Sequence, residues 1–442
     1  MRKAKIVCTI GPASDSVALL DHLIESGMDA ARLNFSHGTH HSHGRAIKAI
    51  REAAGRRQVA VAIIQDLQGP RIRVGDLGNA GIEVVTGQPV RLQTVLARSG
   101  GQLGASSLTP STIPEIPITY QYLVRDVQPG ARILIDDGLI ELVANRISGG
   151  LVECTVAAGG RITSHKGINL PGTRVSAPTL TEKDREDIRF GVAAGVDYLA
   201  LSFVRGPEDV EAAKQLVAEC GGDVPIIAKI ERSEAVNSLT AILDQADGVM
   251  IARGDLGVEM GPEAVPILQK RIIAEANRRR RLVITATQML ESMTQRTSPT
   301  RAEASDVANA VFDGTDAVML SAETAIGQHP VETVRVMDRI IRAAEEGIEP
   351  ASTPRPDADR DEVSCSEAIC TAASTAAAAI TANAIVAFSE LGLTARLISK
   401  QRPAAPIIAF TPFEPIRQRM ALYWGGDSSH DATDCAYGRA HR

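Results

Sequence analysis

The sequence has 442 residues, which at the usual domain size of roughly 100 to 200 residues corresponds to about two to four domains. Apolar residues make up 44% of the chain and charged residues 23%, so the chain can bury a core and wholesale disorder is excluded. The 47 basic and 53 acidic residues give a net charge of -6, which provides no general electrostatic attraction to nucleic acid. Any anion-binding site must therefore be local.

Short runs of β-branched residues recur along the chain, each followed by a longer segment of helical character. This alternation predicts parallel strands covered by helices. The number of runs favours a (β/α)8 TIM barrel, although a doubly wound open sheet requires the same local signals. The runs span Lys5 to Ile10, Ala31 to Phe35, Val59 to Asp66, Tyr198 to Val204, Pro225 to Ile230, Gly248 to Ala252, Leu282 to Ala286 and Ala317 to Leu320.

Two further regions lie outside this alternation of strands and helices: one interrupts it and the other follows it. Residues 71–166 are rich in Gly and Pro and contain short segments such as GIEVV, ARILID and LVECTV, which predict an inserted all-β lid domain. The barrel therefore consists of residues 1–70 and 167–347. After a linker rich in Pro and charge, residues 360–442 predict an α/β domain whose last part, beyond Trp424, lacks a periodic apolar face. We expect this C-terminal domain to be incomplete.

The six cysteines and the apolar segments indicate the compartment. The cysteines are scattered without a C-x-x-C pair, so we interpret them as reduced thiols. The longest uncharged stretch, Ala368 to Ser389, is too rich in Ala, Thr and Ser for a membrane span, and the N-terminal apolar stretch is too short for a signal peptide. We expect a cytoplasmic protein with neither a nucleic acid nor a membrane as its partner.

Ionisable and hydroxyl residues gather where the predicted strands end. Active sites of (β/α)8 barrels form at the carboxyl ends of the strands, so these side chains should converge on one rim. For any single one of them, an ordinary polar position between strand and loop explains the pattern equally well. The residues are Arg32, Asn34, Ser36, His37, Asp66, Arg73, Ser202, Phe203, Lys229, Glu231, Arg253, Asp255, Thr287, Ser321 and Glu323.

Lys229 carries the strongest single signal, because it lies in the apolar run PIIAKIE. A buried ammonium costs several kcal/mol unless it is paired or functional. Glu231 and Asp255, at the ends of adjacent strands, suit a Mg²⁺ ion that takes its other ligands from water and substrate oxygens. An ammonium beside that ion is suited to stabilising charge on a phosphoryl group during transfer.

Other phosphate-binding schemes are not represented. The sequence contains no G-x-x-x-x-G-K-[ST], no G-x-G-x-x-G and no protein-kinase signature. Four histidines between positions 37 and 43 have the short spacings of a loop that enters a helix, which makes a dedicated metal site there the less favoured interpretation.

A series of motifs resembles the pyruvate kinase family, in order, over most of residues 3–345. These motifs are KIVCTIGPAS, GMDAARLNFSHG, DLQGPRIR, IDDGLIEL, HKGINLPG, AKIE, DGVMIARGDLGVE, ITATQMLESM, PTRAEASDVANAV and DGTDAVMLSAETAIGQHP. The resemblance implies a catalytic barrel, a lid inserted after the third strand, a C-terminal α/β domain and a homotetramer. It also implies a glycolytic enzyme that transfers the phosphoryl group of phosphoenolpyruvate to ADP, giving pyruvate and ATP.

The resemblance further assigns roles to residues that match the family's motifs. Glu231 and Asp255 match ligands of Mg²⁺ or Mn²⁺, and Lys229 matches the stabiliser of the transition state. The backbone amides of Gly254 and Asp255 with the Thr287 hydroxyl match the cradle for the substrate carboxylate, and Thr287 is expected to assist enolate protonation near Ser321 and Glu323. Arg32 matches the residue that grips the phosphoryl group. The matching nucleotide-binding residues are Asn34, Phe35, Ser36, His37, Arg73 and Lys166.

One departure concerns K⁺. Asn34, Ser36 and Asp66 match possible ligands of a monovalent cation, but potassium-requiring members show DTKGPEIR where this chain has DLQGPRIR. Leu67 removes a Thr hydroxyl and Arg71 places a cation where a Glu would stand. We expect Arg71 to supply the positive charge, so that K⁺ is not required.

The second departure concerns regulation. Members that bind a sugar phosphate carry a Ser/Thr/Gly-rich loop in the C-terminal domain, whereas this chain has FSELGLTAR, with Glu390 where an anion would be repelled. We therefore expect weak or altered allostery. Two rival interpretations are another Mg²⁺-dependent barrel enzyme, such as a lyase, and an inactive or regulatory relative with a defective C-terminal domain.

Overall fold

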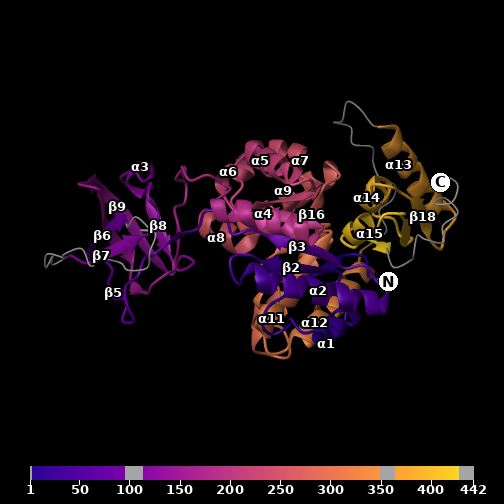
Figure 1. Cartoon of the computed structure of the whole chain (residues 1–442), viewed down its shortest axis with the longest axis horizontal. Coiled ribbons are helices and arrows are strands. Elements are labelled where there is room, and N and C mark those ends of the chain that lie inside the picture. Colours follow the sequence, from indigo (N-terminus) through magenta and orange to yellow (C-terminus); the bar gives the residue numbers. More distant parts are fainter. Residues whose placement is uncertain (1, 95–112, 349–363, 428–442) are drawn as a thin grey trace.

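The computed structural model describes residues 2–94, 113–348 and 364–427. Three bodies lie in a row along the long axis of the molecule (Figure 1). The inserted β domain is at one end, the barrel is in the middle, and the C-terminal domain is at the other end beside the N-terminus. The lid and the C-terminal domain therefore lie on opposite ends of the barrel.

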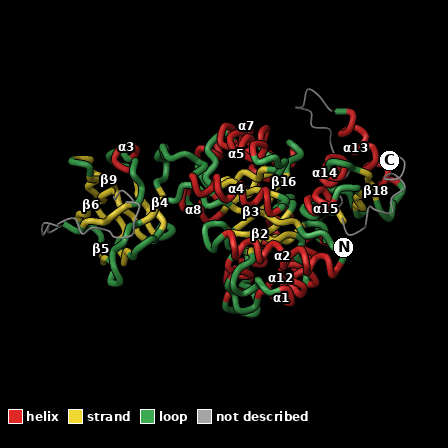
Figure 2. Tube along the Cα trace, in the orientation of Figure 1, coloured by secondary structure: helices red, strands yellow, loops and turns green. Residues whose placement is uncertain are grey.

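The eight predicted runs form the closed parallel barrel that the sequence indicated, and the open-sheet alternative is excluded. Nearly every residue in these strands is buried, as expected for a parallel sheet covered on both faces. Figure 2 shows the strands in the middle of this body, with helices such as α5 and α7 above them and α2 and α12 below. In the order in which they pair around the ring, they are β1 (Lys5–Thr9), β17 (Ala317–Leu320), β16 (Leu282–Ala286), β15 (Gly248–Ala252), β14 (Ile226–Ile230), β13 (Tyr198–Leu201), β3 (Ala62–Asp66) and β2 (Ala30–Asn34).

The covering helices begin at recognisable caps. Thr39, Thr181 and Thr300 each accept a hydrogen bond from a backbone amide in the first turn of the helix that follows. The helices of the barrel are α1 (Val17–Glu25), α2 (His40–Arg57), α4 (Glu182–Ala194), α5 (Pro207–Glu219), α6 (Ser233–Asn237), α7 (Leu239–Gln245), α8 (Arg253–Met260), α9 (Val265–Arg278), α10 (Arg301–Phe312), α11 (Ala322–Ala325) and α12 (Pro330–Glu346), with the 3₁₀ helix η1 (Glu291–Thr294).

The inserted domain is a β structure with its own hydrophobic core. Its larger sheet extends to Asn169, beyond the boundary at Lys166 that the sequence pattern suggested, because Gly167–Asn169 pairs with β4 and β8. The elements are β4 (Ile72–Arg73), β5 (Ile82–Val84), β6 (Pro89–Thr94), β7 (Glu115–Ile118), α3 (Leu123–Asp126), β8 (Arg132–Ile135), β9 (Ile140–Ser148), β10 (Leu151–Ala158), β11 (Gly160–Ile162) and β12 (Gly167–Asn169).

The C-terminal domain has a three-stranded parallel sheet with helices, as the sequence predicted. The expectation that this domain is incomplete concerns residues beyond Trp424, of which 428–442 lie outside the described residues. The elements are α13 (Cys365–Ala379), β18 (Ile385–Phe388), α14 (Leu393–Lys400), β19 (Ile407–Phe410), α15 (Glu414–Met420) and β20 (Gly426–Asp427).

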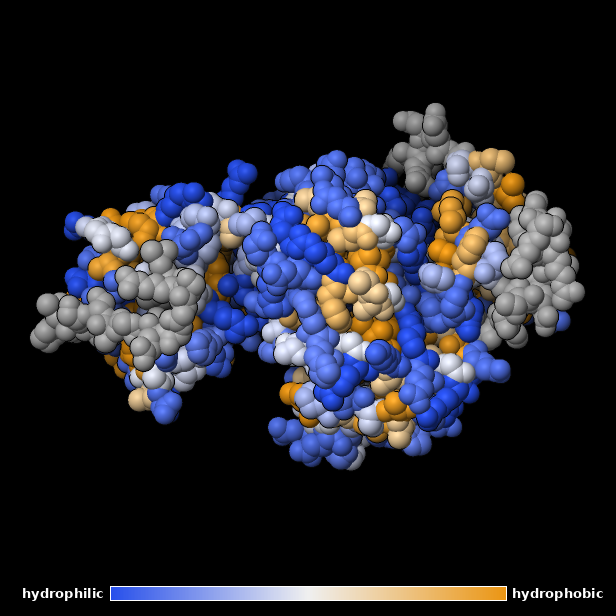
Figure 3. Space-filling model, in the orientation of Figure 1, coloured by the Kyte–Doolittle hydropathy of each residue, from blue (hydrophilic) through white to orange (hydrophobic). Residues whose placement is uncertain are grey.

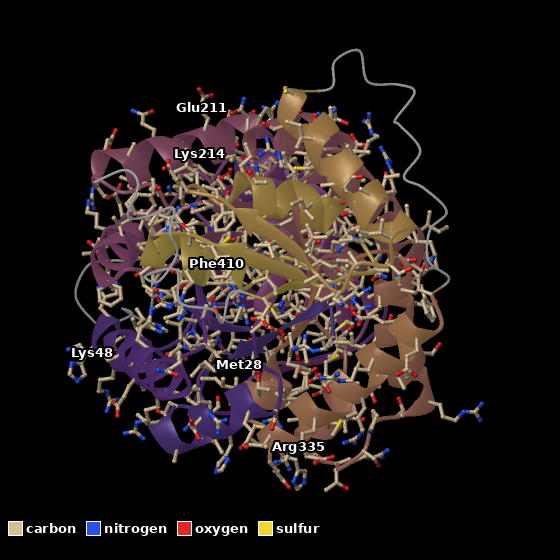
Figure 4. All side chains as sticks on the ribbon, turned by 90° about the vertical axis from the view of Figure 1, so that its right-hand side faces the viewer. Met28, Lys48, Glu211, Lys214, Arg335 and Phe410 are labelled. Carbon is tan, nitrogen blue, oxygen red and sulfur yellow. The ribbon has the colours of Figure 1, made fainter. Side chains whose placement is uncertain are left out.

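This domain closes the amino-terminal end of the barrel. Met420, Leu422 and Tyr423 belong to the same buried cluster as side chains from inside the barrel, such as Ile64 and Ile284. Figure 4 looks along the long axis from this end and shows Phe410 near the centre, with Lys48, Glu211 and Arg335 of the barrel helices around it. The C-terminal domain therefore stabilises the barrel end opposite the rim where the candidate site lies.

None of the helices in the described parts of the chain combines the length and the apolarity that a bilayer crossing requires.

Candidate active site

Lys229 occupies the centre of the rim at the carboxyl end of β14. Its side chain is buried, and its ammonium lies 2.8 Å from Oε1 of Glu231 and 3.2 Å from Oδ1 of Asp66. It also donates a hydrogen bond of 2.7 Å to the Ser202 hydroxyl. These partners raise the pKa of Lys229 in spite of its burial, so the ammonium is charged. Of the two alternatives that the sequence left open for this buried lysine, paired or functional, the structure shows the pairing.

Asp255 is the third residue of α8, which follows β15 directly, and the Glu231 carboxylate acts on it electrostatically. Burial, together with the nearby Glu231 carboxylate, raises the pKa of Asp255 to about 6. The Glu231 charge thus disfavours ionisation of Asp255, and a divalent cation bound by both carboxylates would offset this repulsion. Glu231 Oε2 accepts a hydrogen bond of 2.8 Å from the Phe203 amide, and each oxygen keeps a second lone pair for a ligand. The donor set therefore fits an oxygen-preferring divalent ion, as Mg²⁺ and Mn²⁺ are.

Thr287 faces the beginning of α8 from the end of β16. Its hydroxyl oxygen accepts a hydrogen bond of 2.8 Å from the backbone amide of Gly254. Both Thr287 and Gln288 have positive φ angles, 69° and 54°, which are unfavourable for residues with a Cβ and particularly for a β-branched one. This turn aims the Thr287 hydroxyl at the first turn of α8.

Arg32 projects from inside the barrel wall to the same rim. Its Nε donates to Oδ2 of Asp66 at 2.6 Å, and its NH1 donates to the Thr9 hydroxyl at 3.0 Å. Asp66 therefore bridges the two cations, Arg32 and Lys229, and these partners lower the pKa of Asp66 although burial opposes that shift. The carboxylate fixes both cations in one orientation.

Two of the three predicted ligands of K⁺, Asp66 and Asn34, have protein partners. Asp66 is bonded as described, and Asn34 Oδ1 accepts a hydrogen bond of 3.1 Å from the Ser36 amide. Leu67 is buried and presents only its backbone carbonyl, which accepts from Ser202. Arg71 is exposed and its charge acts on Asp255.

The predicted nucleotide-binding residues come from two parts of the chain, the end of β2 with the loop after it and the lid domain. His37 is exposed on the loop after β2, where partial burial and the nearby Arg71 and Arg73 lower its pKa. Phe35 is buried and stacks on His43 at 4.0 Å between ring centroids, so only its backbone can reach a ligand. In the lid, Lys166 pairs with Asp136 at 2.8 Å.

Two cavities separate the lid from the barrel rim. The smaller one, about 280 Å³, is lined from the lid side by Asp137 and Asn169 and from the barrel side by Arg71, Arg232 and Asp255. The larger one, about 860 Å³, opens beside Gly254. Figure 3 shows the indentation between the lid and the barrel on one face of the molecule. A small phosphorylated acid therefore has room beside Asp255.

Some supporting roles could not be read from the sequence. Ser202 and Arg253 were recognised only as polar residues after strands, because the partners that define them come from other strands. Glu323 is fully buried, and its carboxylate accepts from the amides of Leu290 and Ser321. Two of the histidines between positions 37 and 43 make structural contacts: His40 pairs with Asp187, and His43 bonds to the His37 carbonyl.

Comparison with known proteins identifies the class. The model of the pyruvate kinase barrel domain matches residues 1–334, and the model of the pyruvate kinase alpha/beta domain matches residues 367–435. The fold and the site therefore define a phosphotransferase built on a (β/α)8 barrel.

Individual pyruvate kinases are similar to this chain over nearly its whole length. Pyruvate kinase 2 of Synechocystis sp. is 47% identical over 96% of this chain and 70% of its own length. The pyruvate kinase of Geobacillus stearothermophilus is 46% identical over 96% of this chain and 71% of its own length. A crystal structure of a pyruvate kinase from Cryptosporidium parvum superposes with a TM-score of 0.87 at 39% identity, over 96% of this chain and 86% of that one.

The chain belongs to the pyruvate kinase family. The match to the C-terminal domain over residues 367–435 gives no support to the alternative of a relative with a defective C-terminal domain.

Proposed function

We propose that the chain transfers the phosphoryl group of phosphoenolpyruvate to ADP, giving pyruvate and ATP, at the rim formed by Lys229, Glu231 and Asp255. The observation that carries this assignment is the placement of a charged, buried ammonium 2.8 Å from Glu231, beside a second carboxylate of raised pKa. A divalent ion held by Glu231 and Asp255 would neutralise charge on the phosphoryl and enolate oxygens.

The cations of this chain would act on the transferring group. Lys229 is held by three partners, and Arg32 is fixed by Asp66, so neither side chain has to reorganise as charge develops. Fixed charges in a site from which water is excluded stabilise a transition state more than mobile ones do. Lys229 accordingly serves as the stabiliser and Arg32 as the clamp on the phosphoryl group.

The other end of the substrate would rest on the first turn of α8. The amides of Gly254 and Asp255 belong to the amino-terminal turn of an eight-residue helix, which favours an anion, and the Gly254 amide already donates to the Thr287 hydroxyl. The Thr287 hydroxyl completes this cradle and is suited to guide a proton to the enolate carbon. The buried Glu323 is engaged with backbone amides and acts here by shaping the Ser321 turn.

The nucleotide would enter between the lid and the loop after β2. Asn34, Ser36 and His37 border it from the barrel, and Arg73 and Lys166 from the base of the lid. Closure of the lid over the rim would exclude water, so that phosphoenolpyruvate is not simply hydrolysed.

K⁺ would not be required for this reaction. The pyruvate kinase family usually uses Mg²⁺ and K⁺, but here Arg71 brings a permanent charge toward Asp255, and Asp66 and Asn34 are already bonded within the protein. We assign the enzyme to cytoplasmic glycolysis, as a homotetramer.

A coupled assay tests the function directly. The purified chain is supplied with phosphoenolpyruvate, ADP and Mg²⁺, and pyruvate is detected through lactate dehydrogenase. We expect turnover that is abolished by EDTA and restored by Mg²⁺ or Mn²⁺. Absence of turnover from a folded, metal-loaded chain would refute the proposal.

A further inference from the structure

The guanidinium of Arg253 lies behind the substrate cradle and is only 8% exposed as a residue. Its NH2 donates to the carbonyl of Thr287 at 2.8 Å and to the carbonyl of Gln288 at 3.1 Å. Its Nε also reaches the Thr287 carbonyl, at 3.2 Å. Three of its bonds therefore end on the two residues with positive φ angles.

Arg253 is itself held from the far side. Its NH1 donates to Oδ1 of Asp306 on α10 at 2.8 Å and to the side-chain carbonyl of Gln269 on α9 at 3.3 Å. Because Arg253 is the first residue of α8, the same side chain connects α8, α9 and α10 to the turn after β16. A planar guanidinium can make this fork of bonds, whereas an ammonium cannot.

The strained turn needs such a support. A Thr and a Gln with left-handed backbone angles persist only where surrounding contacts over-determine the conformation. If Thr287 relaxed toward negative φ, its hydroxyl would leave the Gly254 amide, which is 2.8 Å away. The bonds to the two carbonyls oppose this relaxation.

We propose that Arg253 is a positioning residue for the reaction: through the Thr287 and Gln288 carbonyls it holds the Thr287 hydroxyl at the carboxylate-binding turn, and Asp306 anchors it. The inference rests on the proposed function, because it takes the Thr287 hydroxyl and the Gly254 amide as the cradle of the substrate carboxylate. It predicts that replacing Arg253 weakens the binding of phosphoenolpyruvate but not the binding of ADP.

The main test is the variant Arg253→Lys, which keeps the charge and removes the fork. We expect the KM for phosphoenolpyruvate to rise about ten- to a hundredfold, while the KM for ADP changes less than about twofold. Calorimetric binding of phosphoenolpyruvate without ADP should weaken to the same extent. Lys270→Met is the matched control, because Lys270 pairs with Asp313 across the same two helices without touching the turn; we expect it to leave both constants unchanged.

A rescue distinguishes positioning from general support of the fold. Gly adopts positive φ without strain. Gln288→Gly should therefore remove the conformational strain at position 288, which the hydrogen bonds from Arg253 otherwise offset. We expect Gln288→Gly to restore most of the phosphoenolpyruvate affinity in the Arg253→Lys background. Unselective loss toward both substrates, or no rescue, would overturn the proposal.

A second variant keeps the test decisive if Arg253→Lys does not fold. Asp306→Asn alters a side chain that is 39% exposed, and we expect a weaker shift of the same kind, about threefold. If the KM and the binding affinity for phosphoenolpyruvate are unchanged in both variants, the inference about Arg253 is overturned and the proposed function still stands. An inactive parent chain would instead refute the function itself.

Discussion

The Lys229 ammonium lies 2.8 Å from a carboxylate oxygen of Glu231, two residues further along the chain at the same strand end. Alternate residues of a strand point to the same side, so this spacing brings both side chains to the barrel interior. The opposite charges stabilise each other in a buried place, and the second oxygen of Glu231 is fixed by the Phe203 amide. The pair is therefore rigid before any substrate binds.

Glu231→Gln should weaken binding of the divalent ion, because a neutral amide is a poorer ligand for a hard cation than a carboxylate. We expect the Mg²⁺ concentration at half-maximal rate to rise at least about tenfold, and Mn²⁺ binding followed by electron paramagnetic resonance to weaken in parallel. Glu234→Gln removes the same charge three residues away and should leave both titrations unchanged. An unaltered metal titration in Glu231→Gln would contradict the assignment of this ligand.

Replacing K⁺ by tetramethylammonium should leave the rate within about twofold, because Arg71 supplies a permanent charge near Asp255. Arg71→Glu should lower the rate in tetramethylammonium and make it recover with added K⁺. Steady-state rates in the two salts at equal ionic strength provide the measurement. A parent rate that collapses without K⁺ would show that Arg71 does not replace the ion.

Lys400 should make stability depend on pH at the interface between the barrel and the C-terminal domain. It is fully buried and shares the single carboxylate of Asp316 with Arg402, at 2.5 and 2.9 Å, so burial lowers the pKa of Lys400 from 10.5 to about 7. Between these values the unfolded chain binds the proton more strongly than the folded chain. The free energy of unfolding contributed by this group therefore rises with pH across that window and is lowest below pH 7.

The comparison of the parent chain with Lys400→Met isolates this effect. The variant leaves Asp316 paired with Arg402 alone, and it removes the titrating amine. We expect the difference in Tm, parent minus variant, to increase steadily from about pH 7 to about pH 9. A difference that does not change with pH would mean that Lys400 keeps its proton throughout this range.

Gln418→Leu, a change in the C-terminal domain, should lower the stability of the barrel. The Gln418 side-chain carbonyl accepts from the buried Val61 amide at 2.8 Å and from Arg51 at 3.1 Å. Leucine would leave the Val61 amide without an acceptor, at a cost of about 1–3 kcal/mol in the free energy of unfolding, while Arg51 keeps its bonds to the Val61 carbonyl and to Asp197. Thermal unfolding would show a lower Tm, and the neighbouring variant Arg417→Leu, at a side chain that is 15% exposed, offers a comparison that spares Val61. A Tm equal to that of the parent would indicate that water replaces the lost acceptor.

Much of the architecture could be predicted because the relevant signals are local. Runs such as Gly248–Ala252 and Leu282–Ala286 coincide with their strands, since β-branched and apolar residues between turn signals suffice to mark a buried strand. The residues of the rim could be located for the same reason, because each one lies near the carboxyl end of a strand or shortly after it. Lys229, Glu231 and Asp66 do meet there.

The rest depends on contacts between distant segments. The sequence does not show that Asp66 joins Arg32 to Lys229, because the three residues come from different strands whose register is set by the closed barrel. It likewise does not reveal the positive φ angles of Thr287 and Gln288, which are residue types that rarely adopt them. The extension of the lid sheet to Asn169 depends on pairing with strands far away in the chain.

Lys229→Met tests most directly whether the ammonium at the rim stabilises the transferring phosphoryl group. Its contribution belongs mainly to the transition state, so we expect kcat to fall at least about a hundredfold while the KM for phosphoenolpyruvate changes only a few-fold. Circular dichroism and an unchanged Tm would establish that the variant is folded. A folded variant that turns over as fast as the parent chain would contradict the account.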